Sequence, residues 1–239
     1  MLNGHEISIK LYADGANIEE MKEAYAKKIV SGFTTNPTLM RKAGISDYVQ
    51  FAQEAIKAIP DMPISFEVFS DEFDSMEKEA RFIGSWGDNV FIKIPVTNTK
   101  GESSVSLIRK LSSDGLKLNV TAILTLDQVE VVGTALNPLV PSIVSVFAGR
   151  IADTGVDPVP TMKRSAELLG GNPQCELLWA STRELLNIFQ AQDSGCHIIT
   201  ATNDILKKLS MLGKDLTQLS LETVTMFYKD ASSAGFTLI

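Results

Sequence analysis

The chain has 239 residues, of which 44% are hydrophobic and 21% charged, a balance typical of a globular protein and unlike that of a disordered or membrane chain. Its formal net charge of -7 argues against a nucleic-acid partner, because nucleic-acid phosphates require a basic surface. A small phosphorylated ligand is compatible with this charge, since a pocket can gather a few arginines on an acidic protein.

No apolar stretch reaches the roughly 18 residues that a membrane-spanning helix needs. Residues 1–10 lack the basic start and apolar run of a signal peptide, so we expect a cytoplasmic protein with no membrane association. Cys175 and Cys196 show no disulfide framework or CxxC spacing and are predicted to be buried. His5 and His197 have no ligand spacing, so the sequence predicts no metal and no histidine-based triad.

Short apolar runs alternate with longer amphipathic segments along the chain, which is typical of a parallel sheet covered by helices. The predicted strands are Ile7–Ala13, Gly32–Thr35, Pro63–Phe69, Asn89–Pro95, Leu116–Ile123, Ser142–Ala148, Cys175–Ala180 and Cys196–Ala201. The predicted helices are Ile18–Val30, Tyr48–Ile59, Phe73–Trp86, Val105–Leu111, Asp127–Leu136, Thr161–Leu169, Arg183–Gln192, Asp204–Leu212 and Leu216–Ala234. The seventh strand is the weakest of these predictions, because Glu176 interrupts it.

This strand and helix repeat, with no linker and no change of composition, predicts a single (β/α)8 barrel domain over residues 1–239 with an additional C-terminal helix. A doubly wound open sheet is the alternative. Such sheets usually carry a glycine-rich phosphate loop after the first strand, where this chain has Asp-Gly-Ala-Asn at residues 14–17. The closed barrel is therefore the favoured prediction.

Polar residues interrupt several strands that should be continuously apolar. In residues 90–95, period-two alternation places Lys93 on the face opposite Ile92 and Ile94. If the isoleucines face the helices, Lys93 points into the barrel. The same counting predicts that Glu67, Asn119 and Thr121 also face inward, with Ala122 on the outer face.

Two further polar residues follow predicted strands: Asp14 ends the first, and Asn36 comes after the second. Since strand C-termini form the catalytic face of a barrel, these groups can converge there. Structural alternatives remain: Asp14 and Asn36 could cap helices, and Lys93 could pair with a barrel carboxylate. Asn119 and Thr121 could satisfy buried hydrogen bonds, whereas a buried Glu67 needs a partner or a task.

A buried Lys93 has a chemical interpretation. Burial disfavours the ammonium form, and a neutral amine can attack a carbonyl carbon. The resulting iminium is an electron sink that permits cleavage of a neighbouring carbon–carbon bond without a metal.

An arginine follows each of the sixth and seventh predicted strands. Arg150 comes after the sixth strand and Arg183 after the seventh. The arginine fork suits a phosphate dianion, and the N-terminus of a helix predicted to start near Arg183 would add backbone donors. The alternative is that each arginine forms a surface ion pair.

These residues resemble the transaldolase family, and especially its small members, a group that also contains fructose-6-phosphate aldolase. The most specific motifs are TTNP at 34–37, FIKIPVT at 91–97, LNVTA at 118–122 and VFAGRI at 146–151. They occur in the family's order, and the resemblance extends over essentially the whole chain.

The resemblance implies that Lys93 forms a Schiff base and that Asp14 exchanges a proton with the hydroxyl next to the bond that breaks. It implies that Glu67 and Thr121 handle a catalytic water. The remaining residues implied to contact substrate are Asn36 and Asn119 for the dihydroxyacetone unit, Ser145 and Phe147 for the pocket wall, and Arg150, Ser181 and Arg183 for the phosphate.

Within the family, Glu67 and Phe147 are implied to favour transfer, since aldolase members typically carry glutamine and tyrosine at these positions. The resemblance thus implies transaldolase activity on sugar phosphates in the pentose phosphate pathway, with no cofactor. It also implies a pentamer or decamer with the C-terminal helix packed on a neighbour. The alternatives are a fructose-6-phosphate aldolase and, from another class, a non-catalytic sugar-phosphate-binding barrel.

Overall fold

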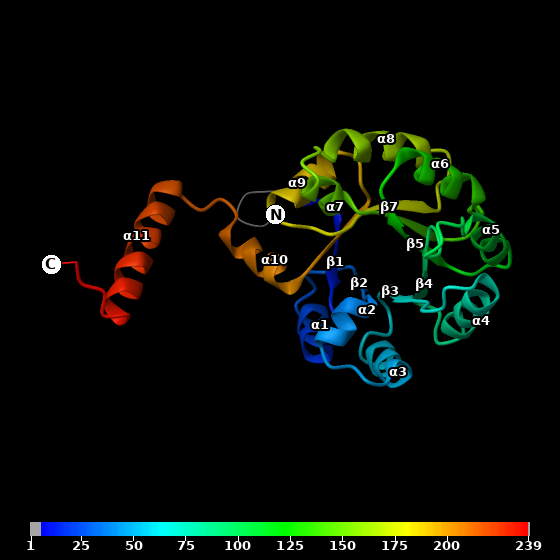
Figure 1. Ribbon diagram of the computed structural model, residues 1–239, viewed down its shortest axis with the longest axis horizontal. Coiled ribbons are helices and arrows are strands. Elements are labelled where there is room, and N and C mark those ends of the chain that lie inside the picture. The colour runs from blue at the N-terminus through cyan, green and yellow to red at the C-terminus, as the bar shows by residue number, and fades with distance from the viewer. Residues whose placement is uncertain (1–5, 239) are drawn as a thin grey trace.

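A computed structural model describes residues 6–238. His5 and the first half of residues 1–10, on which sequence predictions were made, lie outside this range. Eight parallel strands pair in chain order and close into a barrel, so the predicted (β/α)8 fold is confirmed and the open sheet is wrong (Figure 1). The strands are β1 (Lys10–Asp14), β2 (Gly32–Thr34), β3 (Ile64–Glu67), β4 (Val90–Pro95), β5 (Leu118–Ile123), β6 (Ser142–Val146), β7 (Cys175–Trp179) and β8 (Ile198–Ala201).

Helices cover the outside of the barrel, except for the last helix, which extends away from it (Figure 1). They are α1 (Ile18–Ala26), α2 (Pro37–Lys42), α3 (Tyr48–Ala58), α4 (Phe73–Gly84), α5 (Val105–Ser113), α6 (Leu126–Ala135), α7 (Ala148–Asp153), α8 (Val159–Leu169), α9 (Leu186–Asp193), α10 (Asn203–Lys207) with the 3-10 turn Lys208–Met211, and α11 (Leu216–Ser233). Helices α2 and α7 were not predicted from the sequence. Both are single short helices of six residues, too short to show amphipathic periodicity.

The strands follow the alternation expected from their sequences. In β4, Ile92 and Ile94 belong to the core between barrel and helices, with 1% and 0% of their surface exposed. The seventh strand exists despite Glu176, because this carboxylate sits near the N-terminal end of the barrel and pairs with Lys10 at 2.6 Å.

One strand departs from simple alternation. The pairing of β5 with β6 shifts register between Val120 and Ile123, and Ala122 lies there in the left-handed region with φ of 61°. A bulge of this kind inserts an extra residue and re-aims the side chains beside it. The prediction that Ala122 faces the helices is therefore wrong, since it lines the central cavity together with Thr121.

Both cysteines are buried, as predicted, and burial raises the pKa of Cys175 to about 11 and of Cys196 to about 12. Both thiols thus stay protonated at neutral pH. Among residues 6–238, no helix combines the length and apolar character needed to cross a membrane.

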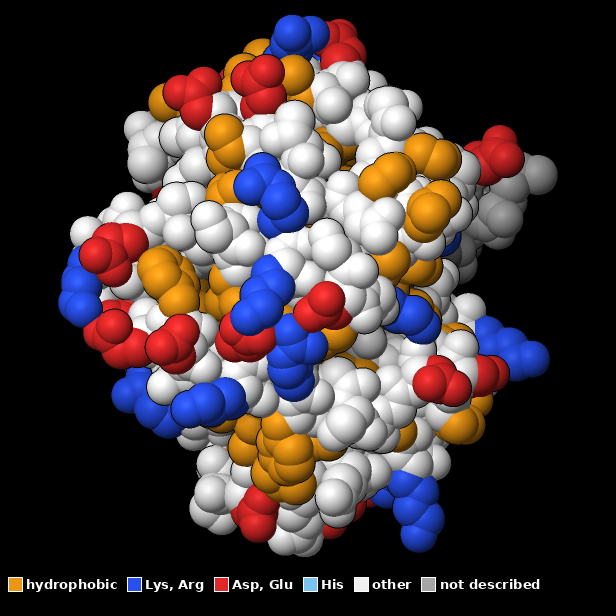
Figure 2. All heavy atoms as spheres, turned by 90° about the vertical axis from the view of Figure 1, so that its right-hand side faces the viewer, with side chains coloured by type: hydrophobic (Ala, Val, Ile, Leu, Met, Phe, Trp, Pro, Cys, Tyr) orange, Lys and Arg blue, Asp and Glu red, His pale blue; other side chains and the backbone are white. Residues whose placement is uncertain are grey.

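Charged side chains of both signs are interspersed on the face shown in Figure 2, which lies on the side of α4 and α5 in Figure 1. Arg81 on α4 pairs with Glu77 on the same helix at 2.8 Å and with Asp114 at the end of α5 at 2.6 Å. Such exposed pairs contribute little to stability individually, but they keep neighbouring charges balanced.

Candidate active site

A cavity of about 440 Å³ opens at the C-terminal ends of the barrel strands. Every residue that the sequence predicted for the site lines it: Asp14, Asn36, Glu67, Lys93, Asn119, Thr121, Ser145, Phe147, Arg150, Ser181 and Arg183. They come from seven of the eight strands or from the segments that follow them. Barrel enzymes place their active sites at this face, so the cavity is the candidate active site.

Three of these residues form one row across neighbouring strands. Glu67 of β3 pairs in register with Lys93 of β4, which in turn pairs with Asn119 of β5. Because side chains in register on adjacent strands point to the same face, all three project into the barrel. The inward orientation predicted from alternation is confirmed for this row.

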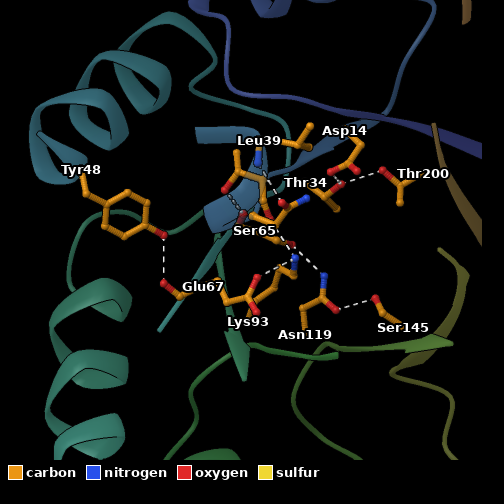
Figure 3. Close-up of polar contacts among 12 residues, drawn as sticks. Asp14, Thr34, Leu39, Tyr48, Ser65, Glu67, Lys93, Asn119, Ser145 and Thr200 are labelled. Carbon is orange, nitrogen blue, oxygen red and sulfur yellow. Dashed lines mark hydrogen bonds and ion pairs between the residues drawn. The ribbon is translucent and has the colours of Figure 1, made fainter. Parts of the chain in front are cut away.

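Lys93 is buried, with 6% of its surface exposed. Its Nζ donates a hydrogen bond to the carbonyl oxygen of Thr35 at 2.8 Å and lies 3.0 Å from Glu67 Oε2 (Figure 3). The ion pair with a barrel carboxylate is the contact that the structural alternative predicted. The Glu67 carboxylate therefore lies within proton-transfer distance of Nζ.

Asn119 is fully buried and held at both ends of its amide. Its Nδ2 donates to Ser65 Oγ at 3.0 Å, and its Oδ1 accepts from Ser145 Oγ at 2.6 Å (Figure 3). These bonds fix which end of the amide carries the donor. Asn119 and Ser145 thus form a rigid polar wall on one side of Lys93.

Thr121 is 2% exposed, and its hydroxyl has no hydrogen-bond partner among the described residues. Leaving a buried hydroxyl unsatisfied costs roughly 1–3 kcal/mol. The prediction that Thr121 only satisfies a buried hydrogen bond is therefore wrong. Because the side chain lines the cavity, its hydroxyl is available to a molecule bound there.

Asp14 ends β1 and does not cap the next helix, since the side chain at the start of α1 is that of Asn17. Instead, Asp14 Oδ1 accepts a hydrogen bond from Thr34 Oγ1 at 2.8 Å. Burial raises the pKa of Asp14, while the charge of Lys93 and the Thr34 hydrogen bond oppose that shift. A carboxyl group shifted towards neutral pH suits proton exchange with a substrate hydroxyl.

Asn36 has a structural role as well as a place in the cavity. Its Oδ1 accepts from the backbone N–H of Leu39 at 3.0 Å, so it is the N-cap of α2, with Pro37 at the first helical position. The capping alternative is confirmed for Asn36. Since the cap uses Oδ1, the amide Nδ2 is the group left to contact a ligand.

The rim of the cavity carries the two predicted arginines. The Arg150 guanidinium lies over the ring of Phe147, with Cζ 5.7 Å from the ring centroid. Arg183 Nε donates to Asp153 Oδ1 at 3.0 Å, and its Nη2 donates to Asp153 Oδ2. The surface ion pair that the sequence offered as an alternative is thus present for Arg183, on a side chain that also lines the cavity.

The helix expected near Arg183 begins later, at Leu186. The backbone N–H of Arg183 donates to Asn187 Oδ1 at 2.9 Å, so it is not a free anion-binding donor as predicted. The first turn of α7 packs closely against the segment that follows β7, because a Cβ on Gly149 would lie 1.6 Å from the carbonyl oxygen of Ser181. Ser181 has a φ of 61°. Only glycine fits at position 149.

Several residues that line the cavity were not predicted as site residues from the sequence, including Thr34, Lys42, Thr200 and Thr202. Thr34 and Thr200 lie on strands, where the alternation that predicted the orientation of Lys93 also applies. Threonine is common in strands, so its presence there gives no functional signal. Lys42 lies on α2, which was not predicted. No strand pattern points to it.

Comparison with known proteins identifies the family of the chain. The family model for transaldolase and fructose-6-phosphate aldolase matches residues 11–238. The chain belongs to this family. Figure 3 shows Lys93, Glu67 and Asn119 of this chain side by side.

Several relatives of the chain are named as probable transaldolases. A "Probable transaldolase" of Thermoanaerobacter sp. (strain X514) is 34% identical over 228 residues, covering 95% of this chain and 99% of the relative. Another, from Caldicellulosiruptor saccharolyticus, is 36% identical over 224 residues, covering 93% and 96%. A third, from Methanococcus maripaludis strain S2, is 35% identical over 202 residues, covering 84% and 89%.

Proposed function

We propose that the protein is a transaldolase that uses Lys93 as its Schiff-base residue. The observation that supports this most directly is the placement of Lys93 Nζ: it is buried in the cavity, 3.0 Å from the Glu67 carboxylate. In the first step, Glu67 takes a proton from the ammonium group, and the free amine attacks the carbonyl carbon of a ketose phosphate such as fructose 6-phosphate. The product is a carbinolamine.

Loss of water from the carbinolamine gives the iminium. The C2 hydroxyl leaves as water after it receives a proton, and the lone pair of the lysine nitrogen forms the C=N bond. In this proposal Thr121 binds the water and Glu67 donates the proton, which is supported by the buried Thr121 hydroxyl having no protein partner among the described residues.

Asp14 then removes the proton from the C4 hydroxyl. The C3–C4 bond breaks, its electrons move to the iminium, and C4 becomes the aldehyde of glyceraldehyde 3-phosphate. The three-carbon unit stays on Lys93 as an enamine. The amide of Asn119 and the hydroxyl of Ser145, fixed by their mutual hydrogen bond, provide polar groups for the hydroxyls of that unit.

Transfer completes the cycle. The enamine carbon attacks the aldehyde of an acceptor such as erythrose 4-phosphate, and the new alkoxide takes a proton from Asp14. Water then hydrolyses the iminium, releasing sedoheptulose 7-phosphate and the free lysine. Arg150, Ser181 and Arg183 are proposed to bind the phosphate, because they lie together at the rim of the cavity.

The aldolase alternative differs only in the fate of the enamine: protonation of its carbon followed by hydrolysis releases free dihydroxyacetone. Product analysis separates the two. We expect fructose 6-phosphate alone to give little dihydroxyacetone, and fructose 6-phosphate with erythrose 4-phosphate to give sedoheptulose 7-phosphate and glyceraldehyde 3-phosphate. Rapid dihydroxyacetone release with no acceptor would identify an aldolase, and binding without any product would identify a non-catalytic barrel.

A homo-oligomer formed through α11 is part of the proposal. This helix extends away from the barrel in Figure 1, and none of its residues is buried. Its exposed apolar residues Leu221, Val224 and Tyr228 recur at helical spacing. A second copy of the chain is the proposed partner, and sedimentation of the full chain against a chain ending at Lys214 tests it. The pentose phosphate pathway remains a prediction from the resemblance, and the cytoplasmic location remains a prediction from the sequence.

A further inference from the structure

Two buried threonines connect Asp14 to the opposite side of β1. Thr34 and Thr200 are 3% and 5% exposed, and both line the cavity. Their hydroxyl oxygens lie 2.6 Å apart, and Thr34 Oγ1 lies 2.8 Å from Asp14 Oδ1. Figure 3 shows the three side chains close together, with the contact between Thr200 and Thr34 drawn as a dashed line.

The barrel brings these residues together. Asp14 pairs in register with Thr34 of β2, and on its other side β1 pairs with β8, where Thr200 lies opposite Tyr12. The backbone carbonyl of Thr200 accepts a hydrogen bond from Thr182 Oγ1 at 2.7 Å, which anchors that end of β8. The contacts therefore rest on three adjacent strands rather than on mobile loops.

The direction of the hydrogen bonds follows from counting hydrogens. Each threonine hydroxyl has one hydrogen to donate. Thr34 donates its hydrogen to Asp14 Oδ1, so in the contact between the two threonines Thr34 must accept and Thr200 must donate. A hydroxyl that accepts one hydrogen bond becomes a stronger donor in the next.

We propose that Thr200 and Thr34 form a hydroxyl chain that positions the Asp14 carboxylate for the aldol step, with Thr200 as a positioning residue that acts through Thr34. This inference rests on the proposed function. Thr34 occupies Oδ1, while Oδ2 has no hydrogen-bond partner among the residues that the structure describes and is left to face the substrate hydroxyl. Oδ1 is thereby held in position, and Oδ2 is available to exchange a proton with the substrate.

The hydroxyl chain also affects the ionisation of Asp14. Burial disfavours the ionised carboxylate and the neighbouring Glu67 charge opposes it, whereas Lys93 and the Thr34 hydroxyl favour it. In the aldol step the iminium on Lys93 carries a positive charge, so the iminium and the Thr34 hydroxyl both favour an ionised Asp14.

The test is the pH profile of kcat/KM for the complete transfer reaction in four variants of the full chain: Thr34→Val, Thr200→Val, Thr200→Ser and Thr200→Ala. Valine keeps the shape of threonine and removes the hydroxyl, while serine keeps the hydroxyl. Alanine removes the hydroxyl without placing a methyl group against Thr34, so it serves where Thr200→Val does not fold.

Losing the direct hydrogen bond to a charged group predicts a decrease of about 10- to 100-fold for Thr34→Val. Losing the hydrogen bond from Thr200 to Thr34 predicts a decrease in kcat/KM of about 2- to 5-fold for Thr200→Val and Thr200→Ala. Because the lost donors stabilise the carboxylate, the acid limb of the profile moves to higher pH, further for Thr34→Val. Thr200→Ser restores the wild-type profile.

Trapping of the Lys93 adduct with borohydride is measured in parallel and should proceed at the wild-type rate, since Asp14 is not used until the iminium exists. An acid limb unmoved in both Thr200→Val and Thr200→Ala overturns the inference, as does loss of adduct formation in folded Thr200 variants. If the wild-type chain itself forms no adduct and no product, the proposed function has failed instead.

Discussion

The floor and the rim of the cavity are built in different ways. The floor consists of three strand residues in register, Glu67, Lys93 and Asn119. Lys93 and Asn119 are buried, and the Glu67 side chain is 17% exposed. The rim carries Arg183, whose side chain is 48% exposed and held by one exposed carboxylate, Asp153. A buried floor fixes atoms precisely enough for covalent chemistry, whereas an exposed rim provides charge that must be oriented by a neighbour.

This difference predicts that changes in the floor abolish turnover and that changes in the rim weaken the binding of phosphorylated substrates. Lys93→Met has the largest expected effect. Methionine keeps the length and apolar stem of lysine but has no amine, so turnover should fall by at least about 10⁴-fold. Initial rates with fructose 6-phosphate and erythrose 4-phosphate measure the loss, and binding of inorganic phosphate should persist.

The matched control for that variant is Lys100→Met, which removes an exposed lysine paired with Glu72 outside the cavity. It should leave the rate unchanged. Substantial transfer activity in Lys93→Met would show that another group carries the covalent step.

Asp14→Asn comes next. Asparagine cannot accept the proton of the C4 hydroxyl, so kcat should fall by about 10²- to 10⁴-fold. The wild-type kcat/KM should increase as the pH rises through the pKa of Asp14, which burial places above the usual value for aspartate. The pH profile of the variant should lack that limb. Retention of the limb in Asp14→Asn would assign it to a different group.

Arg183→Ala tests the rim. Losing a charged hydrogen-bonding group should reduce kcat/KM for fructose 6-phosphate by about 10- to 100-fold, mostly through KM. The rate with unphosphorylated fructose should be unaffected, which distinguishes lost phosphate binding from a distorted site. An equal loss with both sugars would contradict the assignment of Arg183 to the phosphate.

Asp153→Ala has the smallest expected effect. It frees Arg183 from its two hydrogen bonds and lets the exposed guanidinium move, so KM for fructose 6-phosphate should increase by about 2- to 5-fold with kcat unchanged. A lower KM in this variant would mean that Asp153 competes with the phosphate rather than orienting the arginine.

The same difference between floor and rim governs what the sequence could predict. Alternation in β4 placed Lys93 correctly because a strand has a fixed period of two. It failed at Ala122, where the bulge in β5 breaks that period and no local residue type announces it. Register between strands, which puts Glu67 beside Lys93, depends on long-range pairing and was not visible in the sequence.

At the rim, the sequence supplied Arg150 and Arg183 but not their surroundings. The start of α9 at Leu186 was misplaced because Asn187 turns back to bond the N–H groups of Arg183 and Glu184, a local contact that periodicity does not report. Short helices such as α7 were missed because six residues are too few to show amphipathic periodicity.

Reductive trapping tests the central claim most directly. The full chain is incubated with fructose 6-phosphate, reduced with sodium borohydride, digested, and the modified peptide is identified by mass spectrometry. The account predicts one stable adduct of a dihydroxyacetone or ketose-phosphate unit on Lys93, absent in Lys93→Met and present in Lys100→Met. An adduct on another lysine, or turnover with no adduct, would contradict it.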